Sequence, residues 1–526
     1  MLCFVYMTRE IKNILLYVAD QWRGDTIGAM GHPTVHTPNI DAFAAESVTF
    51  FRHYCQALPC GPSRASILTG LYLHNHRVVS NGTPLPADIR NVAQHLQEAE
   101  YSPALFGYTD TPLDPDVQPN AFNGTSAEDW ICPGFTAIAP FLFADGFSGW
   151  AAELAAKGYT LPDDPRHLWD PSNEPYTPAK NGLLAPSRIA TADTDTAWLT
   201  DQLLVYVDAM AERPWFAHFN CLKPHPPLFA SRPYDTLHNP ADIPLPLGVQ
   251  KRDQIAAQHP WLAYEYDAQE SRRAEYPSEK ASIAEYNEWD ARRLRVAYYG
   301  NCSEIDAQFG RIIDRLKFAG VYDETLIIFC SDHGEQLGNN GFWGRRGPYD
   351  GNFHVPMIVR DPREAADSVR GSRVNAFTEH VDLLPTILDA LNLENTDTVD
   401  GHSLVPFLQG APPPVWRDAV HFAYDFRDLT GKSVETALGL ASTECHFRAV
   451  RGERWKYVEF PTLPPLLFDM VNDPGEGTDL AGDPSFSDII SEYSDRLQDL
   501  AEQLPRRDLS GWFQPYGGEL RQYDVM

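Results

Sequence analysis

The stretch Lys12–Val18 reads KNILLYV and is followed at once by Ala19-Asp20-Gln21. A short run of branched apolar residues is typical of a strand that is buried on both faces of a parallel sheet. The polar residues after the run predict that the strand ends there with its tip exposed. Because open α/β sheets bind ligands beyond the carboxyl ends of their strands, this tip is the first place to look for a site.

Four more stretches have the same apolar character, and each stops at polar or glycine-rich sequence. They are Pro103–Tyr108, Pro214–Asn220, Thr325–Ser331 and Val355–Arg360. Helical periodicity lies between them, at Thr37–Ser47, Ser63–Gly70, Asn91–Ala99, Asp193–Ala211, Ala291–Ala319 and His380–Leu393. The alternation of strands and helices predicts an α/β fold with a doubly wound, mostly parallel sheet flanked by helices.

Two long segments interrupt this pattern, at about residues 111–186 and about residues 228–285. Segments of this length without regular periodicity are usually functional loops or lids. We expect both insertions to cover the site and to select the substrate. Residues 1–415 are therefore assigned to one catalytic domain that carries the two insertions.

The sequence changes character from Trp416 onward. The stretch FRAVRGERWKYVEF predicts two strands joined at Arg451-Gly452-Glu453, and a closing helix is predicted at Phe486–Gln503. Residues 416–526 are thus expected to form a smaller α+β subdomain with a small antiparallel sheet.

Composition narrows the class of protein. The chain of 526 residues is 43% hydrophobic, so it can bury a large core. Its formal net charge of −30 argues against a nucleic-acid surface, which needs clustered Lys and Arg. No stretch approaches the length of a membrane span, so no membrane partner is expected.

The cysteines and the N-terminus predict a cytoplasmic protein. The eight cysteines are scattered without the close pairing of a disulfide scaffold or a zinc site, which indicates a reducing compartment. The apolar segment Met1–Met7 is too short for the core of a signal peptide and lacks a small-residue cleavage site.

The segment Pro59–Gly70 reads PCGPSRASILTG and places a cysteine before a Gly-Pro turn at a predicted helix start. The positive end of a helix stabilises a thiolate or a bound anion, although a lone cysteine of this kind is as often a loop residue. The segment resembles the Cys-x-Pro-Ser-Arg signature of the sulfatase branch of the alkaline phosphatase superfamily. The matching residues are Cys60, Pro62, Ser63, Arg64 and Leu68-Thr69-Gly70.

The resemblance implies an alkaline phosphatase-like fold and an unusual nucleophile. In this family a formylglycine-generating enzyme converts the signature cysteine, so that enzyme is the expected maturation partner for Cys60. The hydrated aldehyde would supply the oxygen nucleophile, activated by a metal that lowers the pKa of this oxygen. Arg64, one helical turn further on, would steady the diol oxygens by charge-assisted hydrogen bonds.

The strand Thr325–Ser331 leads into Asp332-His333-Gly334-Glu335, which puts a carboxylate and an imidazole at the same sheet edge as Asp20. At a strand-to-loop break, two consecutive side chains can turn toward one ion. In sulfatases these two strand tips hold the divalent metal. The resemblance therefore implies a ligand set of Asp20, Gln21, Asp332, His333 and the oxygen of converted Cys60.

The ligand set departs from the commonest sulfatase pattern at two positions. Sulfatases commonly carry a second Asp where Gln21 stands, and many carry Asn where His333 stands. An amide and an imidazole make a softer, less anionic site, which favours Mn²⁺ and leaves Ca²⁺ or Zn²⁺ as alternatives. The strings ADQWRGD and SDHGEQLG resemble the phosphonate monoester hydrolase and phosphodiesterase subgroup, a resemblance that also implies a homo-oligomer.

Further positions match the family in order. His225 in KPHPP resembles the histidine that protonates the leaving oxygen, and Lys223 beside it is a candidate second cation for the substrate. Asn81 corresponds to a polar contact near the nucleophile, while Tyr108 and Thr109 resemble substrate-contacting residues. A structural role is the alternative for His225, and a turn formed with the next glycine is the alternative for Asn81.

Two positions depart from the subgroup. Asp110 stands where a threonine is expected, and a carboxylate there either selects a positively charged substrate or points away from the site. Arg345 in GFWGRRGPYD stands where the family usually offers a lysine to the ester oxygens, and its neighbour Arg346 competes for this role.

Together these residues predict a formylglycine-dependent and metal-dependent hydrolase of small anionic esters. Phosphonate monoesters and phosphate diesters are the expected substrates, with sulfate monoesters as secondary ones. Three alternatives stay open: a dedicated aryl or alkyl sulfatase, a noncatalytic anion-binding protein in which Cys60 stays a thiol, and a zinc phosphomonoesterase that uses Ser63 directly.

Overall fold

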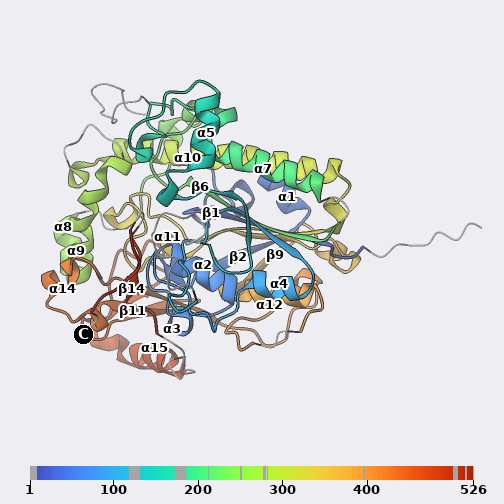
Figure 1. Ribbon diagram of the computed structural model, residues 1–526. Helices are drawn as coiled ribbons and strands as arrows, with labels where there is room; N and C mark the ends of the chain where they lie inside the picture. The colour runs from blue at the N-terminus through green and yellow to red at the C-terminus, as the bar shows by residue number, and fades with distance from the viewer. Residues whose placement is uncertain are drawn as a thin grey trace, which may run out of the picture.

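The protein is described from a computed structural model of the chain (Figure 1). The structure describes residues 9–117, 131–171, 185–210, 213–248, 251–276, 280, 282–394, 397–500, 508–515 and 518–524. The segment Met1–Met7 and the end of the predicted closing helix lie outside the described residues.

An eight-stranded sheet lies at the centre of the fold, in the order β5-β4-β6-β1-β7-β8-β2-β9. Its strands are β1 (Asn13–Asp20), β2 (Val48–Tyr54), β4 (Ser102–Gly107), β5 (Thr136–Pro140), β6 (Trp215–Pro224), β7 (Thr325–Ser331), β8 (Met357–Arg360) and β9 (Arg373–Glu379). Neighbouring strands run parallel, except that β8 is antiparallel to both β7 and β2. The predicted α/β fold with a mostly parallel sheet is confirmed.

Strands β2, β5 and β9 and the antiparallel direction of β8 were not predicted from the sequence. Polar Arg52 and His53 break the apolar run of β2, and exposed residues alternate along the edge strand β9. Strand β8 is antiparallel because no crossover helix connects it to β7. The loop after β7 turns the chain back, so β8 runs beside β7 in the opposite direction.

Two layers of helices cover the sheet (Figure 1). Leu15 and Tyr17 of β1 point into the first layer, while Leu16 and Val18 point into the second, so the strand is apolar throughout. The first layer contains α1 (Pro38–Ala45), α7 (Asp195–Ala209) and α10 (Glu288–Phe318). The second contains α2 (Cys60–Thr69), α4 (Val92–Glu98) and α12 (Leu383–Ala390).

A second sheet, in the order β13-β12-β11-β10-β3, joins the C-terminal part to the N-terminal part of the chain through β3. Its strands are β3 (Ala57–Leu58), β10 (Ala419–Asp425), β11 (His446–Gly452), β12 (Trp455–Glu459) and β13 (Leu466–Asp469). Strand β3 pairs with β10 and ends two residues before Cys60. The small C-terminal sheet therefore helps to fix the start of the helix that carries the signature cysteine.

The structure also contains several other helices and one further pair of strands. They are the helices α3 (Leu73–His76), α11 (Asp350–Phe353), α13 (Val405–Leu408), α14 (Ser433–Leu438) and α15 (Ser487–Asp499), and the strand pair β14 (Trp512–Phe513) and β15 (Arg521–Gln522). Within the described ranges, no helix combines the length and the apolar character needed to cross a membrane. The seven described cysteines are all buried and none of them forms a disulfide.

The two insertions contain regular structure that their sequences do not reveal. The first contributes the edge strand β5 and the helix α5 (Ser148–Ala156), and its Trp150 and Trp169 lie in the core. The second contains α8 (Arg252–Gln258) and α9 (Pro260–Ala268). Trp261 of α9 is fully buried and stacks on Phe426 of the C-terminal part, with ring centroids 4.9 Å apart. The second insertion is thus packed against the small sheet.

This packing predicts a large loss of stability for Trp261→Ala. Removing a buried tryptophan leaves a cavity, and we expect a cost of about 3–5 kcal/mol in the free energy of unfolding. Thermal or denaturant unfolding measures this change. Trp289→Ala is the matched control, because that side chain is 52% exposed, and it should leave stability almost unchanged. Equal losses for the two variants would contradict the packing described here.

Candidate active site

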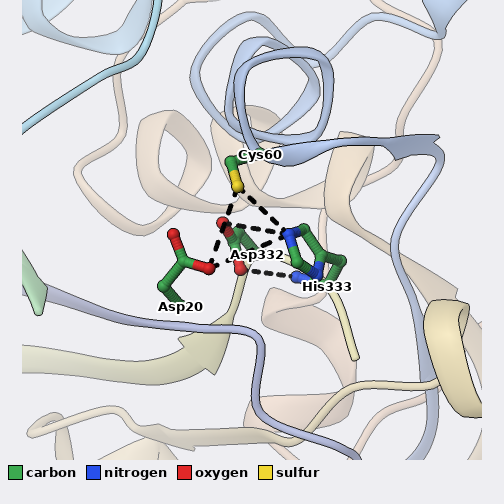
Figure 2. A group of neighbouring side chains, drawn as sticks. All are labelled: Asp20, Cys60, Asp332 and His333. Atoms are coloured by element: carbon green, nitrogen blue, oxygen red, sulfur yellow. Dashed lines mark hydrogen bonds and ion pairs between the residues drawn. The ribbon is translucent and has the colours of Figure 1, made fainter. Parts of the chain in front are cut away.

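The tips of β1 and β7 lie side by side because the two strands are adjacent and parallel, with Ala19 opposite Ser331. This register places Asp20 next to Asp332, and helix α2 brings Cys60 to the same edge (Figure 2). One ligand atom from each of Asp20, Cys60, Asp332 and His333 lies within 4.8 Å of the others. Four of the five predicted metal ligands are therefore brought together.

His333 is oriented for metal binding by the bond that its other ring nitrogen makes. Nδ1 lies 3.0 Å from the carbonyl oxygen of Gly334, which assigns the proton to Nδ1. The lone pair of Nε2 then faces the cluster, 3.2 Å from Cys60 Sγ and 3.8 Å from Asp20 Oδ1. Burial holds the pKa of His333 well below its usual value, so the imidazole is neutral, as a ligand must be.

The two carboxylates of the cluster repel each other inside the protein. Burial and the charge of Asp20 raise the pKa of Asp332 to about 7. The pKa of Asp20 is lowered instead, because the charges of His225 and Arg64 outweigh its burial. Within the described residues Asp332 Oδ2 accepts no hydrogen bond, and it forms an ion pair with Arg64 Nη2 at 3.0 Å. Two neighbouring buried carboxylates fit a divalent cation.

Arg64 is the cation that the sequence places one helical turn after Cys60. Its side chain is only 1% exposed, and Nη2 lies 3.1 Å from Asp20 Oδ2 and 3.0 Å from Asp332 Oδ2. The guanidinium lies over the ring of Tyr108, whose hydroxyl donates to Asp20 Oδ2 at 2.6 Å. Asp110 Oδ2 is 3.8 Å from Arg64 Nε, so this unexpected carboxylate faces the site.

Gln21 and Arg345 form the other side of the site. Arg345 Nη1 donates to Gln21 Oε1 at 2.9 Å and lies 3.3 Å from His225 Nε2. His225 Nδ1 is bound to the carbonyl oxygen of Pro226 at 2.5 Å, which leaves Nε2 directed into the site. Arg346 does not share this position, because its Nη1 is paired with Glu265 at 2.6 Å.

The remaining predicted substrate contacts each bond to another part of the chain. Asn81 Oδ1 accepts a hydrogen bond at 2.8 Å from the backbone amide of Gly61, directly beside Cys60. Thr109 Oγ1 accepts from the amide of Cys132 at 3.1 Å. Lys223 is buried, and its Nζ lies 2.7 Å from Glu304 Oε1. Lys223 thus has a carboxylate partner in the core. Lys223 itself lies on β6, the strand that also leads to His225.

The signature residues explain how α2 is held in place. Gly70 ends the helix in the left-handed conformation, with φ of +68°, as expected of a glycine at a helix end. The hydroxyl of Ser63 donates to the carbonyl oxygen of Asp332 and is fully buried, so it is engaged in joining α2 to β7. Burial raises the pKa of the Cys60 thiol well above its usual value.

Three polar residues that received no role from the sequence contribute to the site. Asn220 accepts a hydrogen bond from Arg64, and Tyr298 donates to the carbonyl oxygen of Gln21 at 2.7 Å. Glu335 is fully buried and binds the side chain of Gln21. Asn220 ended a predicted strand, although β6 continues to Pro224, and Glu335 lies within the string SDHGEQ, so both carried a visible signal; Tyr298 in the middle of α10 carried none.

Comparison with known proteins decides the family. A family model described as Sulfatase matches residues 12–393. The chain belongs to the sulfatase family. A second model, described as N-sulphoglucosamine sulphohydrolase, C-terminal, matches residues 338–503 of this sulfatase-family chain. Membership makes the protein a hydrolase that acts on ester bonds.

Similar proteins extend over nearly the whole chain. The multifunctional alkaline phosphatase superfamily protein PehA of Trinickia caryophylli is 37% identical over 503 residues, which cover 93% of this chain and 95% of PehA. The crystal structure of the phosphonate monoester hydrolase of Agrobacterium radiobacter has a TM-score of 0.87 and 36% identity, and the match covers 98% of this chain and 100% of that one. The choline-sulfatase of Rhizobium meliloti is 28% identical over 91% of this chain and 84% of its own.

The raised pKa of Asp332 predicts proton release when a metal binds. Because the folded pKa is about 7, this carboxyl keeps its proton at pH 6, and an arriving cation must displace it. Titration of metal-free Cys60→Ala with Mn²⁺ at pH 6 should release about one proton per ion, and clearly less at pH 8. The Cys60→Ala background removes the thiol as a second source of protons.

Calorimetry in buffers of different ionisation enthalpy measures this release. Adding Asp332→Asn to the Cys60→Ala protein should abolish the difference between pH 6 and pH 8. Binding of Mn²⁺ without proton release at pH 6 would show that Asp332 is already ionised in the metal-free protein.

Proposed function

We propose that this sulfatase-family protein is a formylglycine-dependent, metal-dependent hydrolase of phosphonate monoesters and phosphate diesters, with secondary activity toward sulfate monoesters. The observation that carries the proposal is the position of Gln21 and His333, each directly after one of the two clustered carboxylates, Asp20 and Asp332. Similarity to two phosphonate monoester hydrolases supports it, since their structures share 36% and 35% identity with this chain over 98% of its length.

The metal would be held by Asp20, Asp332, His333, Gln21 and an oxygen at position 60, with Mn²⁺ as the favoured ion. A divalent ion bound there lowers the pKa of an oxygen nucleophile and neutralises the charge of an anionic ester. The carboxylate repulsion between Asp20 and Asp332 supports this assignment, because a cation between them removes it.

Conversion of Cys60 to formylglycine is supported by the state of the thiol. Burial keeps the pKa of Cys60 raised, so an unconverted side chain would remain a protonated and unreactive thiol. We therefore propose that a formylglycine-generating enzyme acts on this chain before the helix α2 is buried, in the cytoplasm.

The cations and the histidine of the site complete the proposed machinery. Arg64, which pairs with Asp332, would steady the oxygens at position 60, and Arg345, beside His225, would bind an ester oxygen. His225 presents Nε2 beside Arg345, so its imidazole can hand a proton to a leaving oxygen. Burial lowers the pKa of His225, so the ring is mainly neutral and must take up a proton on Nε2 before it can give that proton to the leaving oxygen.

A dedicated sulfatase is the second candidate function. The choline-sulfatase of Rhizobium meliloti and the arylsulfatase of Clostridium perfringens are 28% and 26% identical to this chain. Both are less similar to it than the two phosphonate monoester hydrolases, at 36% and 35%. The ranking favours the first candidate.

Initial rates on matched aryl esters test the proposal. The protein, matured together with a formylglycine-generating enzyme and supplied with Mn²⁺, should hydrolyse the phenylphosphonate and the phosphate diester faster than the sulfate. Cys60→Ala should lose all three activities, because no aldehyde can form. Preferential turnover of the sulfate ester would overturn the first candidate in favour of the second, and undiminished activity of Cys60→Ala would contradict both.

A further inference from the structure

Glu335 lies on the loop after β7 and collects four hydrogen-bond donors on one buried carboxylate. Oε1 accepts from the backbone amides of Leu337 at 3.0 Å and Gly344 at 2.5 Å. Oε2 accepts from the hydroxyl of Tyr276 at 3.0 Å and from the side-chain amide nitrogen of Gln21. The side chain is 0% exposed, so these donors replace the water that an ionised carboxylate would otherwise bind.

The backbone of Gln21 is fixed on both sides. Its φ of +67° is unusual for a residue other than glycine. The amide donates to Asp332 Oδ1 at 2.9 Å, and the carbonyl accepts from the hydroxyl of Tyr298 at 2.7 Å. Because the backbone is held, what remains to be set is the orientation of the side-chain amide. Either its oxygen or its nitrogen can face the predicted metal ligands.

Glu335 sets the orientation of this amide. The side-chain amide of Gln21 lies between a carboxylate, which only accepts, and the guanidinium of Arg345, which only donates. The nitrogen must therefore face Glu335 and the oxygen must face Arg345. Arg345 Nη1 also lies 3.3 Å from His225 Nε2, and the backbone amide of Gln21 is bound to Asp332 Oδ1, so the amide oxygen of Gln21 lies beside the predicted metal ligands.

We propose that Glu335 is a positioning residue that presents the amide oxygen of Gln21 as a metal ligand. The proposal rests on the proposed metal dependence and extends it by one residue. An amide whose N–H groups bind a carboxylate carries more negative charge on its oxygen, which strengthens that oxygen as a ligand. Partners of this kind typically change metal affinity by about 10–100-fold when they are replaced.

The same carboxylate connects the second insertion to the metal site. Tyr276 belongs to that insertion and shares Oε2 with Gln21. The loop that carries Arg345 is also bound by the insertion, through Gln269 to the amide of Trp343 at 3.1 Å. Glu335 therefore lies where the insertion, the Arg345 loop and the metal ligands meet.

Glu335→Gln is the decisive variant because it preserves shape. The new side chain can still accept from Leu337 and Gly344 through its oxygen, but its nitrogen then meets the nitrogen of Gln21. Two donors cannot pair, so the amide of Gln21 must turn and offer its nitrogen to the metal. We expect Mn²⁺ to bind about 10–100-fold more weakly. The measurement is a titration of metal-free protein with Mn²⁺, without substrate.

A double-mutant cycle separates positioning from general support of the fold. Gln21→Ala alone should weaken Mn²⁺ binding, and adding Glu335→Gln to it should weaken binding no further, because the amide that Glu335 orients is gone. Tyr276→Phe removes the other donor to Oε2 and should change the affinity far less. Additive losses from Gln21→Ala and Glu335→Gln would overturn the proposal.

A variant in which the two residues are exchanged keeps the test valid if Glu335→Gln folds poorly. Combining Gln21→Glu with Glu335→Gln restores the hydrogen bond with donor and acceptor reversed, so Mn²⁺ affinity and melting temperature should both recover above those of Glu335→Gln. Failure of the pair to recover Mn²⁺ affinity would contradict the inference. If the unaltered protein itself bound no Mn²⁺, the proposed metal dependence would fail; if it bound Mn²⁺ and Glu335→Gln bound it equally well, only the inference about Glu335 would fail.

Discussion

The repulsion between the buried carboxylates of Asp20 and Asp332 is the constraint around which the site is built. Adjacent parallel strands end in register, so the two side chains lie close together. Two carboxylates in a pocket without water are unfavourable unless positive charge lies against them. Arg64, buried to 1% exposure between them, supplies part of that charge, and the proposed divalent cation would supply the rest.

The neighbouring elements can be understood as supports for that arrangement. Helix α2 carries Cys60 and Arg64 on consecutive turns, and Ser63 joins this helix to the tip of β7. Strand β3 fixes the chain just before Cys60 by joining the C-terminal sheet. The second insertion packs on the same sheet through Trp261 and reaches the site through Tyr276. Stability of the small sheet and geometry of the site are therefore linked.

The sequence was sufficient for those parts of the site that depend on strand ends. The apolar run before Asp20 and the identical bounds of the predicted and observed strand Thr325–Ser331 placed both carboxylates at one edge. The signature around Cys60 located the third element. These features are local, because an apolar run and the polar residue that ends it lie within ten positions of each other.

Contacts between residues far apart in the chain could not be predicted from the sequence. Nothing near Ala57 indicates a partner in β10, and the ion pair of Arg346 with Glu265 joins segments 81 positions apart. The carboxylate of Lys223's partner, Glu304, lies in the middle of a long helix. Such contacts are set by the tertiary fold. They pair Arg346 with Glu265 and Arg345 with Gln21, a difference that residue type alone does not show.

The central claim, conversion of Cys60 to formylglycine, is tested most directly by the mass of one peptide. Cleavage after Arg52 and Arg64 yields HYCQALPCGPSR, which also contains Cys55 as an internal control. In active protein that has been denatured and alkylated, the account predicts a single alkyl group, on Cys55, and the mass of an aldehyde in place of the thiol at position 60. An active protein whose peptide carries alkyl groups on both cysteines would contradict it.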